Sequence, residues 1–296
     1  VVYLVWGSTY LAIRYAVESI PPLLMAGTRF LVAGGILYAW QVLRGSRTAR
    51  TPVATRAQWK GAAITGLFLI SASYGLVSWA ELTVPSGIVA LVTAMTPVWM
   101  VVIPMLAGST GRPSPLVIFG IALGLAAQAL LFGIGGVDHQ TIDAVGLGAV
   151  ILAGISWAIG SLRAQRGDLP PDAFLSSAMQ MLTGGVMLVI ASLLVGEVRG
   201  FSLERVTLHS FLAWTYLVVA GSIVAYSAYL YLLKSTSLAR ASTYAYVNPI
   251  VAVALGWLLA GEPFGPRTVI AMLLTLLAVL AINRGAQNVV IPQERA

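Results

Sequence analysis

Ten long apolar runs are the feature that most constrains how this chain can fold. Each run has about 17–25 residues, the length that an α-helix needs to cross the hydrocarbon core of a bilayer. The runs are continuously apolar and show no sustained alternation between two faces, which excludes a transmembrane β-barrel. The sequence therefore predicts an all-α membrane protein with ten transmembrane helices, at approximately residues 1–17, 22–43, 59–79, 85–103, 114–134, 144–163, 173–196, 209–233, 242–260 and 267–283.

Composition also places the chain in a lipid environment. Hydrophobic residues make up 58% of the chain and charged residues only 9%, against roughly 25% charged residues in a soluble domain. There is no cysteine, which excludes disulfides and thiolate metal sites. The chain opens at Val1 within an apolar run and without an initiator methionine, so we expect that its natural start is not included.

The basic residues predict the orientation. If the first helix starts in the cytoplasm, 12 of the 17 basic residues fall on the cytoplasmic side and three on the outer side, while Arg14 and Arg29 lie within predicted spans. Lysine and arginine accumulate in cytoplasmic loops. We therefore expect both termini in the cytoplasm, and we attribute the formal net charge of +7 to these loops rather than to nucleic-acid binding.

The two halves of the chain repeat one another. Because each half carries five helices, an odd number, the second half enters the membrane inverted. We predict two inverted five-helix repeats, over residues 1–140 and 141–285, and a cytoplasmic tail over 286–296. Carriers built in this way bind substrate near the bilayer midplane, where the repeats meet, so the repeat predicts a transporter. Five features recur at offsets of 149–152 residues: Trp6 as Trp157, Pro21-Pro22 as Pro170-Pro171, Gly34-Gly35 as Gly184-Gly185, Ser71 as Ser222, and Pro97 as Pro249.

Polar and aromatic side chains recur on one face of several predicted helices. In lipid their hydrogen-bonding groups would stay unused, so they turn toward a neighbouring helix or toward a cavity. For any single residue both alternatives remain open, because Ser and Thr also join packed helices and Tyr and Trp form interfacial belts. For the whole set we predict a substrate-binding cavity formed by Trp6, Tyr10, Tyr74, Ser78, Thr93, Thr96, Trp99, Trp157, Ser161, Tyr226, Tyr229, Tyr244 and Asn248.

Proline interrupts two predicted helices at equivalent places. Pro97 follows Thr96, and Pro249 follows Asn248. A proline removes one backbone hydrogen bond and bends the helix, which produces either a fixed kink or a hinge between two half-helices. We hypothesise that both prolines, Pro97 and Pro249, act as hinges.

Four charged residues lie in or near the predicted outer ends of the helices. Arg14 and Glu18 are one turn apart, so they can form an ion pair. Arg29 lies about 10 Å below the outer end of its helix, where it can pair with Glu18 or Glu81 or contact carbonyl groups. We hypothesise that the four form an outer gate, with a permanent structural brace as the alternative.

Several kinds of chemistry are absent from the sequence. No Asp or Glu lies deep in a predicted span, and His139 and His209 lie in or beside outer loops, so facilitated diffusion or exchange is favoured over a proton relay. There is no HExxH motif, facing aspartate pair or Walker loop, so we expect no catalytic residue, no metal, no cofactor and no enzyme activity. The expected partners are the lipid bilayer and a small-molecule substrate. The GxxxG motif at 120–124 allows internal packing or a dimer, and we expect a monomer.

Residues 6–14 (WGSTYLAIR), followed by Pro21-Pro22, Ala26 and Arg29-Phe30, resemble the first-helix signature of the EamA branch of the drug/metabolite transporter superfamily. The Thr96-Pro97 and Asn248-Pro249 helices resemble its fourth and ninth spans. The resemblance covers nearly the whole chain. It implies a ten-helix carrier of small metabolites in the bacterial inner membrane, commonly an amino-acid exporter, with helices one, three, four, six, eight and nine around the central site.

The predicted cavity suggests the substrate. Aromatic faces suit apolar rings and ammonium groups, and the hydroxyl and amide side chains can bind a polar head group. We predict export of amphipathic amino acids, aromatic or bulky apolar ones first, as in the aromatic amino-acid exporters that the chain resembles. A cationic drug or nucleotide-sugar carrier of the same fold is the first alternative, and a channel is the alternative from a different class.

Overall fold

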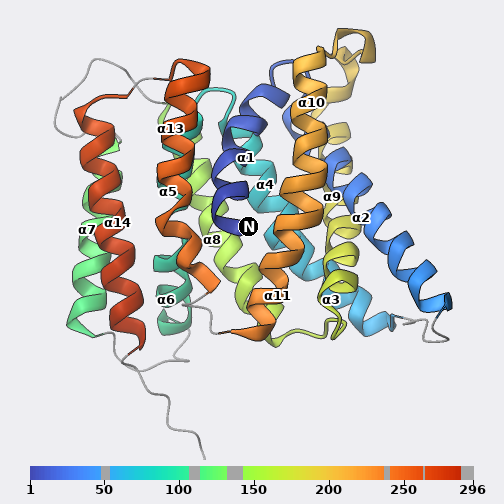
Figure 1. The fold of residues 1–296 in the computed structure, drawn as a ribbon, viewed down its shortest axis with the longest axis horizontal. Helices are drawn as coiled ribbons and strands as arrows, with labels where there is room; N and C mark the ends of the chain where they lie inside the picture. The colour runs from blue at the N-terminus through green and yellow to red at the C-terminus, as the bar shows by residue number, and fades with distance from the viewer. Residues whose placement is uncertain (48–53, 107–113, 132–142, 237–240, 263, 288–296) are drawn as a thin grey trace, which may run out of the picture.

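The computed structural model describes residues 1–47, 54–106, 114–131, 143–236, 241–262 and 264–287, and these residues contain helices and no strand (Figure 1). Each of the ten predicted runs corresponds to one helical stretch in this part of the chain. The stretches of the first half are α1 (Val2–Ala16), α2 (Pro22–Arg47), α3 with η1 and α4 (Arg56–Gly66, Leu67–Ala72, Ser73–Ala80), α5 with α6 (Ser86–Thr93, Thr96–Leu106) and α7 (Pro115–Leu131).

The second half follows the same plan. Its stretches are α8 (Ala144–Arg166), α9 (Ala173–Val195), α10 with η4 and α11 (Leu208–Tyr216, Leu217–Tyr226, Ser227–Ser235), η5 with α13 (Ser242–Tyr246, Asn248–Ala260) and α14 (Pro266–Gln287). Two short turns, η2 (Glu197–Gly200) and η3 (Leu203–Arg205), connect α9 to α10.

The helices have membrane-spanning dimensions. Within the described residues, eight stretches are long and apolar enough to cross a bilayer, while α1 and α7 are shorter, with 15 and 17 residues. α1 lies in the middle of the bundle, where it contacts α5, α10 and α13 (Figure 1). The predicted all-α membrane architecture is confirmed.

Both proline-containing helices are interrupted where the sequence predicts. α5 ends at Thr93 and α6 begins at Thr96, so that Pro97 occupies the first turn of α6, where its missing N–H costs nothing. In the second half a 3-10 segment, η5, precedes α13, and Pro249 lies in the first turn of α13. The interruptions are features of the structure, and hinge motion at Pro97 and Pro249 remains a prediction.

A π-helical segment interrupts two other helices at equivalent positions. The segment η1 covers Leu67–Ala72 and η4 covers Leu217–Tyr226. A π-helical turn contains extra residues, so it rotates the following side chains relative to regular α-helical spacing. Ser71 lies in η1 and donates to the carbonyl of Gly184 on α9 at 3.0 Å, away from the side chains that follow it. Ser71 therefore packs α3 and α4 against α9 and does not line the cavity.

α7 and α14 form a separate pair at one edge of the bundle (Figure 1). A Cβ added at Gly120 would lie 2.8 Å from the carbonyl oxygen of Ala278 on α14. The absence of a side chain at Gly120 thus lets the two backbones approach closely. In this structure the GxxxG motif serves packing within the chain.

Candidate functional site

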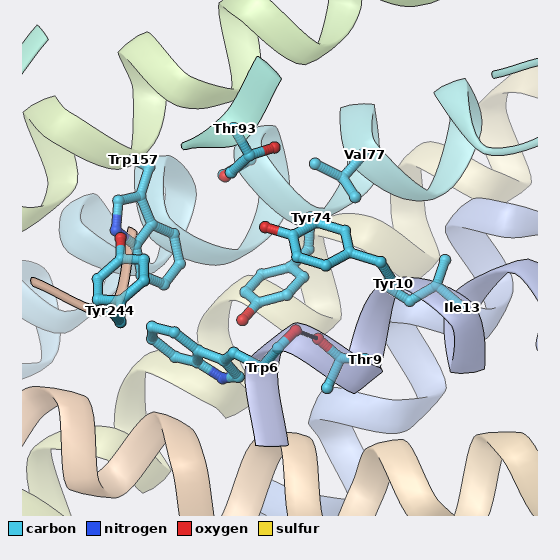
Figure 2. Close-up of a pocket in the computed structure, with 10 residues that line it drawn as sticks. Trp6, Thr9, Tyr10, Ile13, Tyr74, Val77, Thr93, Trp157 and Tyr244 are labelled. Atoms are coloured by element: carbon cyan, nitrogen blue, oxygen red, sulfur yellow. Dashed lines mark hydrogen bonds between the residues drawn. The ribbon is translucent and has the colours of Figure 1, made fainter. Parts of the chain in front are cut away.

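A small cavity lies near the centre of the bundle, between elements of both halves (Figure 2). It offers about 40 Å³, which is room for water and not for a metabolite. Its wall combines indole, phenol and hydroxyl groups with a few aliphatic side chains. The lining residues are Trp6, Thr9, Tyr10, Ile13, Ser73, Tyr74, Val77, Thr93, Trp157 and Tyr244.

α1 contributes one continuous face to the wall. Trp6, Thr9, Tyr10 and Ile13 are spaced i, i+3, i+4 and i+7, so they lie on one side of the helix. The small residue Gly7 faces the other way, where an added Cβ would lie 2.6 Å from Cβ of Val251 on α13. This close approach holds α1 against α13 and turns its aromatic face toward the cavity.

Three aromatic rings of the cavity wall and a fourth ring behind them pack against one another. The Trp6 ring meets Trp157 edge to face, with centroids 5.3 Å apart, and meets Tyr244 in the same way at 5.2 Å. Tyr229 lies 5.0 Å from Trp6 and 5.1 Å from Trp157. Such edge-to-face contacts contribute about 0.5–1.5 kcal/mol per pair beyond burial. We call Trp6, Trp157, Tyr229 and Tyr244 the aromatic cluster.

Hydrogen bonds fix the orientation of Trp157. Its indole nitrogen donates to the Tyr229 hydroxyl at 3.1 Å, and the Ser161 hydroxyl lies 2.7 Å from the same oxygen. The Trp6 indole nitrogen donates to the carbonyl of Gly221 at 3.3 Å. Both indoles therefore have their polar atom satisfied, which leaves their ring faces and edges for the cavity.

The predicted substrate-binding residues fall into three groups. Trp6, Tyr10, Tyr74, Thr93, Trp157 and Tyr244 line the cavity. Ser161 and Tyr229 lie behind Trp157, through the bonds just described. The remaining five, Ser78, Thr96, Trp99, Tyr226 and Asn248, are not part of the wall in this structure.

Those five residues have structural contacts of their own or lie within packed helices. The Thr96 hydroxyl donates to the carbonyl of Thr93 at 2.6 Å, and the Tyr226 hydroxyl donates to Oε1 of Gln180 at 2.8 Å. With its amide nitrogen as donor, Asn248 bonds the carbonyl of Tyr3 at 2.7 Å. Ser78 is fully buried on α4, and the Trp99 ring lies against Gly154 of α8.

Four residues of the wall were not predicted: Thr9, Ile13, Ser73 and Val77. A signal existed for the first two, because they share the helical face of Trp6 and Tyr10. Ser73 and Val77 follow the π-helical segment η1, whose effect on side-chain direction cannot be read from spacing alone.

The four predicted gate residues make contacts that differ from the expected ion pairs. Arg14 donates through Nη1 to the carbonyl of Glu81 at 2.6 Å, and Glu18 lies 3.8 Å from exposed His209. The Nε of Arg29 donates to the hydroxyl of Ser222 at 2.7 Å. Among the described residues, the predicted ion pairs of Arg14 with Glu18 and of Arg29 with Glu18 are absent, because a backbone carbonyl and a hydroxyl take these donors. Arg29 and Glu81 interact electrostatically without a salt bridge, so a gate formed by the four residues remains a prediction.

A carboxylate holds two helices together at the predicted outer end. Glu262, just after α13, accepts hydrogen bonds from the amides of Ser86 at 2.7 Å and Gly87 at 3.0 Å, at the N-terminus of α5. A helix N-terminus carries unpaired N–H groups and partial positive charge, so it stabilises an anion. Glu262 thereby joins the helices that contain Pro97 and Pro249.

A second carboxylate lies at the same end, at the start of α8. Asp143 accepts from the Thr83 hydroxyl at 2.7 Å and from the amide of Val145 at 3.0 Å. The Thr83 bond first, and then the Val145 bond, lower the pKa of Asp143 below its ordinary value, because both donors favour the charged carboxylate.

Replacing Glu262 with alanine is expected to open the cavity toward this end. Two bonds to a charged acceptor are lost, each contributing about 1.5–3 kcal/mol. Because the chain has no native cysteine, Thr93→Cys provides a single reporter in the cavity wall. We expect its labelling by a membrane-impermeant maleimide, added outside, to become about tenfold faster or more in the Glu262→Ala background.

Glu197→Ala is the matched control for this experiment. Glu197 accepts from the amides of Leu23 and Leu24 at the N-terminus of α2, which does not line the cavity. Equal labelling rates in the two variants would show that Glu262 is only a helix cap.

Within the described residues, no group of three or more His, Cys, Asp or Glu side chains could hold a metal ion. A larger apolar groove of about 710 Å³ lies between α2 and α10, lined by residues that include Val32 and Phe211, which are exposed on the outside of the bundle. The groove therefore lies on the surface of the bundle that faces the lipid. The central cavity is thus the better candidate for a site that selects a polar metabolite.

Comparison with known proteins identifies relatives along the whole chain. Residues 1–133 and 144–284 match the EamA-like transporter family. The inner membrane transporter YedA of Escherichia coli (strain K12) is 40% identical over 284 residues, which cover 96% of this chain and 88% of that protein. The transporter YvbV of Bacillus subtilis (strain 168) is 22% identical over 95% of this chain and 88% of its own length. Protein PecM of Dickeya dadantii (strain 3937) is 23% identical over 94% and 89%.

A solved crystal structure has the same fold. It superposes with a TM-score of 0.68 at 17% sequence identity, covering 97% of this chain and 96% of the other. At this identity the likeness concerns the fold alone.

Proposed function

Because the chain belongs to the EamA-like transporter family, we propose that this multi-pass membrane transporter exports small amphipathic amino acids, aromatic or bulky apolar ones first, through its central cavity. The observation that carries the proposal is the aromatic cluster beside hydroxyl groups at a cavity lined by both halves of the chain. Indole and phenol faces bind apolar rings and ammonium groups, and Thr9, Ser73 and Thr93 offer hydroxyls to a polar head group.

Transport by alternating access suits the closed cavity. A space of about 40 Å³ cannot admit an amino acid, so the helices around it have to part before substrate enters. The interruptions before Pro97 and Pro249 are places where half-helices can move against each other. In this mechanism the cavity opens to the cytoplasm, closes around the substrate and opens to the outside.

We propose that transport is driven by facilitated diffusion or by exchange, without coupling to protons. The ten residues that line the cavity include no carboxylate and no histidine, which are the usual parts of a proton relay in a membrane, and the buried Glu81 nearby finds no such group in that wall to pass a proton to. Substrate movement then follows its own concentration gradient or is coupled to a second substrate.

The purified protein in liposomes is expected to show saturable uptake and counterflow of labelled phenylalanine. A pH gradient is expected to change the initial rate by less than about twofold, because no relay couples proton movement to the cavity. Protein-free liposomes are the control, and labelled threonine tests whether a smaller side chain is also accepted.

Each other outcome of this experiment overturns a different part of the proposal. Absence of saturable uptake of any amino acid overturns the substrate, and counterflow of a cationic drug or a nucleotide sugar would then identify the alternative carriers. Strict dependence on the pH gradient overturns uncoupled transport. Single-channel currents in a planar bilayer would identify a channel.

A further inference from the structure

Two buried ionisable side chains, a guanidinium and a carboxyl group, lie near the central cavity, and neither forms a salt bridge within the described residues. Arg29 and Glu81 are both fully buried. Among the described residues, the Nη1 and Nη2 atoms of Arg29 and both carboxylate oxygens of Glu81 have no hydrogen-bond partner. Burying an unpaired charge costs several kcal/mol, which a protein tolerates where the charge has a task.

Arg29 is held in place by groups that satisfy only part of its guanidinium. Ser222 accepts from Nε, the Tyr74 side chain also interacts electrostatically with the guanidinium, and the rings of Phe30 and Tyr74 lie 4.7 and 5.0 Å from the guanidinium carbon. A Cβ added at Gly221 would lie 2.8 Å from Nη2, so a larger residue there would displace the guanidinium. Arginine stays charged in proteins, and its planar fork matches a carboxylate with two parallel hydrogen bonds.

Glu81 has the complementary arrangement. Arg14, the nearest bonded cation, donates to the backbone carbonyl of Glu81 and leaves the carboxylate unsatisfied. Glu262, which also acts on the charge of Glu81, is already engaged by two amides of α5. Arg14 and Arg29 act on the Glu81 carboxyl group only from a distance, so both of its oxygens are free to accept hydrogen bonds from a bound cation.

Both side chains lie next to residues of the cavity wall, because Arg29 on α2 contacts the ring of Tyr74 and Glu81 directly follows α4. Tyr74, Val77 and Glu81 are spaced i, i+3 and i+7 on one face of the stretch that begins at α4. Tyr74 and Val77 line the cavity, Arg29 lies over the Tyr74 ring, and Glu81 is one turn beyond Val77. Seven residues of helix correspond to about 10 Å. The aromatic cluster forms a further wall beside this axis.

We propose that Arg29 and Glu81 are the two poles of a zwitterion-binding site, with Arg29 binding the α-carboxylate of the substrate and Glu81 its α-ammonium group. The inference rests on the proposed function and adds how the site recognises an amino acid as a class. Two ion pairs of about 4 Å each, joined by the short carbon link of an α-amino acid, span a distance of the same order as the rise from Tyr74, which Arg29 contacts, to Glu81. The aromatic cluster then receives the side chain.

The cavity is too small for an amino acid in this structure, and Tyr74 both lines it and lies against Arg29. Opening of the bundle has to move this ring aside before a carboxylate reaches the guanidinium. The carboxylate and ammonium groups of the substrate then become partners of two buried groups that otherwise lack them. Binding therefore offsets the cost of burying these groups without partners, in addition to adding contacts.

Two analogues of phenylalanine test the two poles separately in the counterflow assay. Phenethylamine lacks the carboxylate, and 3-phenylpropionate lacks the ammonium group. We expect each to compete at least about tenfold more weakly than phenylalanine with the unmodified protein. In Arg29→Gln the apparent affinity for phenylalanine is expected to fall about 10- to 100-fold while that for phenethylamine stays unchanged. In Glu81→Gln the apparent affinity for phenylalanine is expected to fall by a similar factor, while the apparent affinity for 3-phenylpropionate stays unchanged.

Two charge-removing variants away from the cavity are the controls. Lys234, which donates to the carbonyls of Pro170 and Pro171, is changed to Gln, and exposed Glu204 is changed to Gln. Both variants are expected to prefer phenylalanine over the two analogues as strongly as the unmodified protein does. Arg29→Lys keeps a positive charge at this position, so it is expected still to bind phenylalanine more tightly than phenethylamine.

The outcomes separate the two proposals. If the unmodified protein transports no amino acid, the proposed function fails. If it transports phenylalanine but both analogues compete equally well, the zwitterion site is overturned even where Arg29→Gln does not fold. The site is also overturned if Arg29→Gln weakens phenylalanine and phenethylamine by the same factor.

Discussion

Gly34→Leu is expected to leave little folded protein in the membrane, whereas Gly35→Leu, at the next residue, is expected to be tolerated. A Cβ added at Gly34 would lie 2.8 Å from Cβ of Met181 and 3.0 Å from the carbonyl oxygen of Ala178, both on α9. Backbone atoms cannot retreat as a flexible side chain can, so a leucine has to push α2 away from α9. Overpacking of this kind costs about 1–3 kcal/mol or more.

Gly35 is a matched control because nothing lies within 4 Å of an added Cβ there. Leucine also has the higher helix propensity, so Gly35→Leu should be neutral or stabilising. Membrane abundance and the melting temperature in detergent, followed by fluorescence size-exclusion chromatography, measure both variants. Equal melting temperatures for the two variants would contradict the close α2–α9 contact.

Trp157→Ala is expected to reduce transport per folded molecule by about tenfold or more and to destabilise the protein by about 3–5 kcal/mol. The Trp157 ring lies 5.3 Å from Trp6, 5.7 Å from Tyr74 and 5.1 Å from Tyr229, so it joins the aromatic cluster to the other wall of the cavity. Alanine leaves a void in the cluster and removes a surface that, in the proposed function, receives the substrate side chain.

Two further variants separate packing from recognition at this position. Trp157→Phe keeps an aromatic face but loses the indole donor to Tyr229, so we expect transport to fall much less than in Trp157→Ala. Trp40→Ala removes an indole that is 43% exposed and outside the cavity, and it should leave transport unchanged. Initial rates of phenylalanine counterflow, divided by the amount of folded protein, provide the comparison. Equal rates for Trp157→Ala and Trp40→Ala would contradict the assigned role.

Part of the cavity could be predicted because α1 is a regular helix. Trp6 and Tyr10 were identified from residue type, and Thr9 and Ile13 follow from the same helical spacing. The wall contributed by α4 is different, because the π-helical segment η1 changes the direction of the side chains after it. Polar residue type also placed Tyr226 in the predicted set, although its hydroxyl bonds Gln180 between packed helices.

The charged residues show a second limit of sequence reasoning. Hydropathy identified Arg29 as a costly charge within a span, but its neighbours come from residues almost 200 positions away, such as Ser222. Glu81 lies at the end of its helix in the sequence and was expected near the surface, yet the surrounding helices bury it completely. Such contacts depend on how different helices pack against one another, which cannot be predicted from the sequence of one helix.

The sequence by itself determined the all-α membrane class, the ten helical stretches and the two interruptions at Pro97 and Pro249. These depend on local properties, namely the length of an apolar run and the missing N–H of proline, which act in any tertiary context. Only the tertiary structure decided which side chains face the cavity, that the cavity is too small for an amino acid, and that Arg29 and Glu81 are buried near it without a salt bridge in the described residues. These depend on π-helical rotations and on helix-to-helix distances, which arise only when the whole bundle packs.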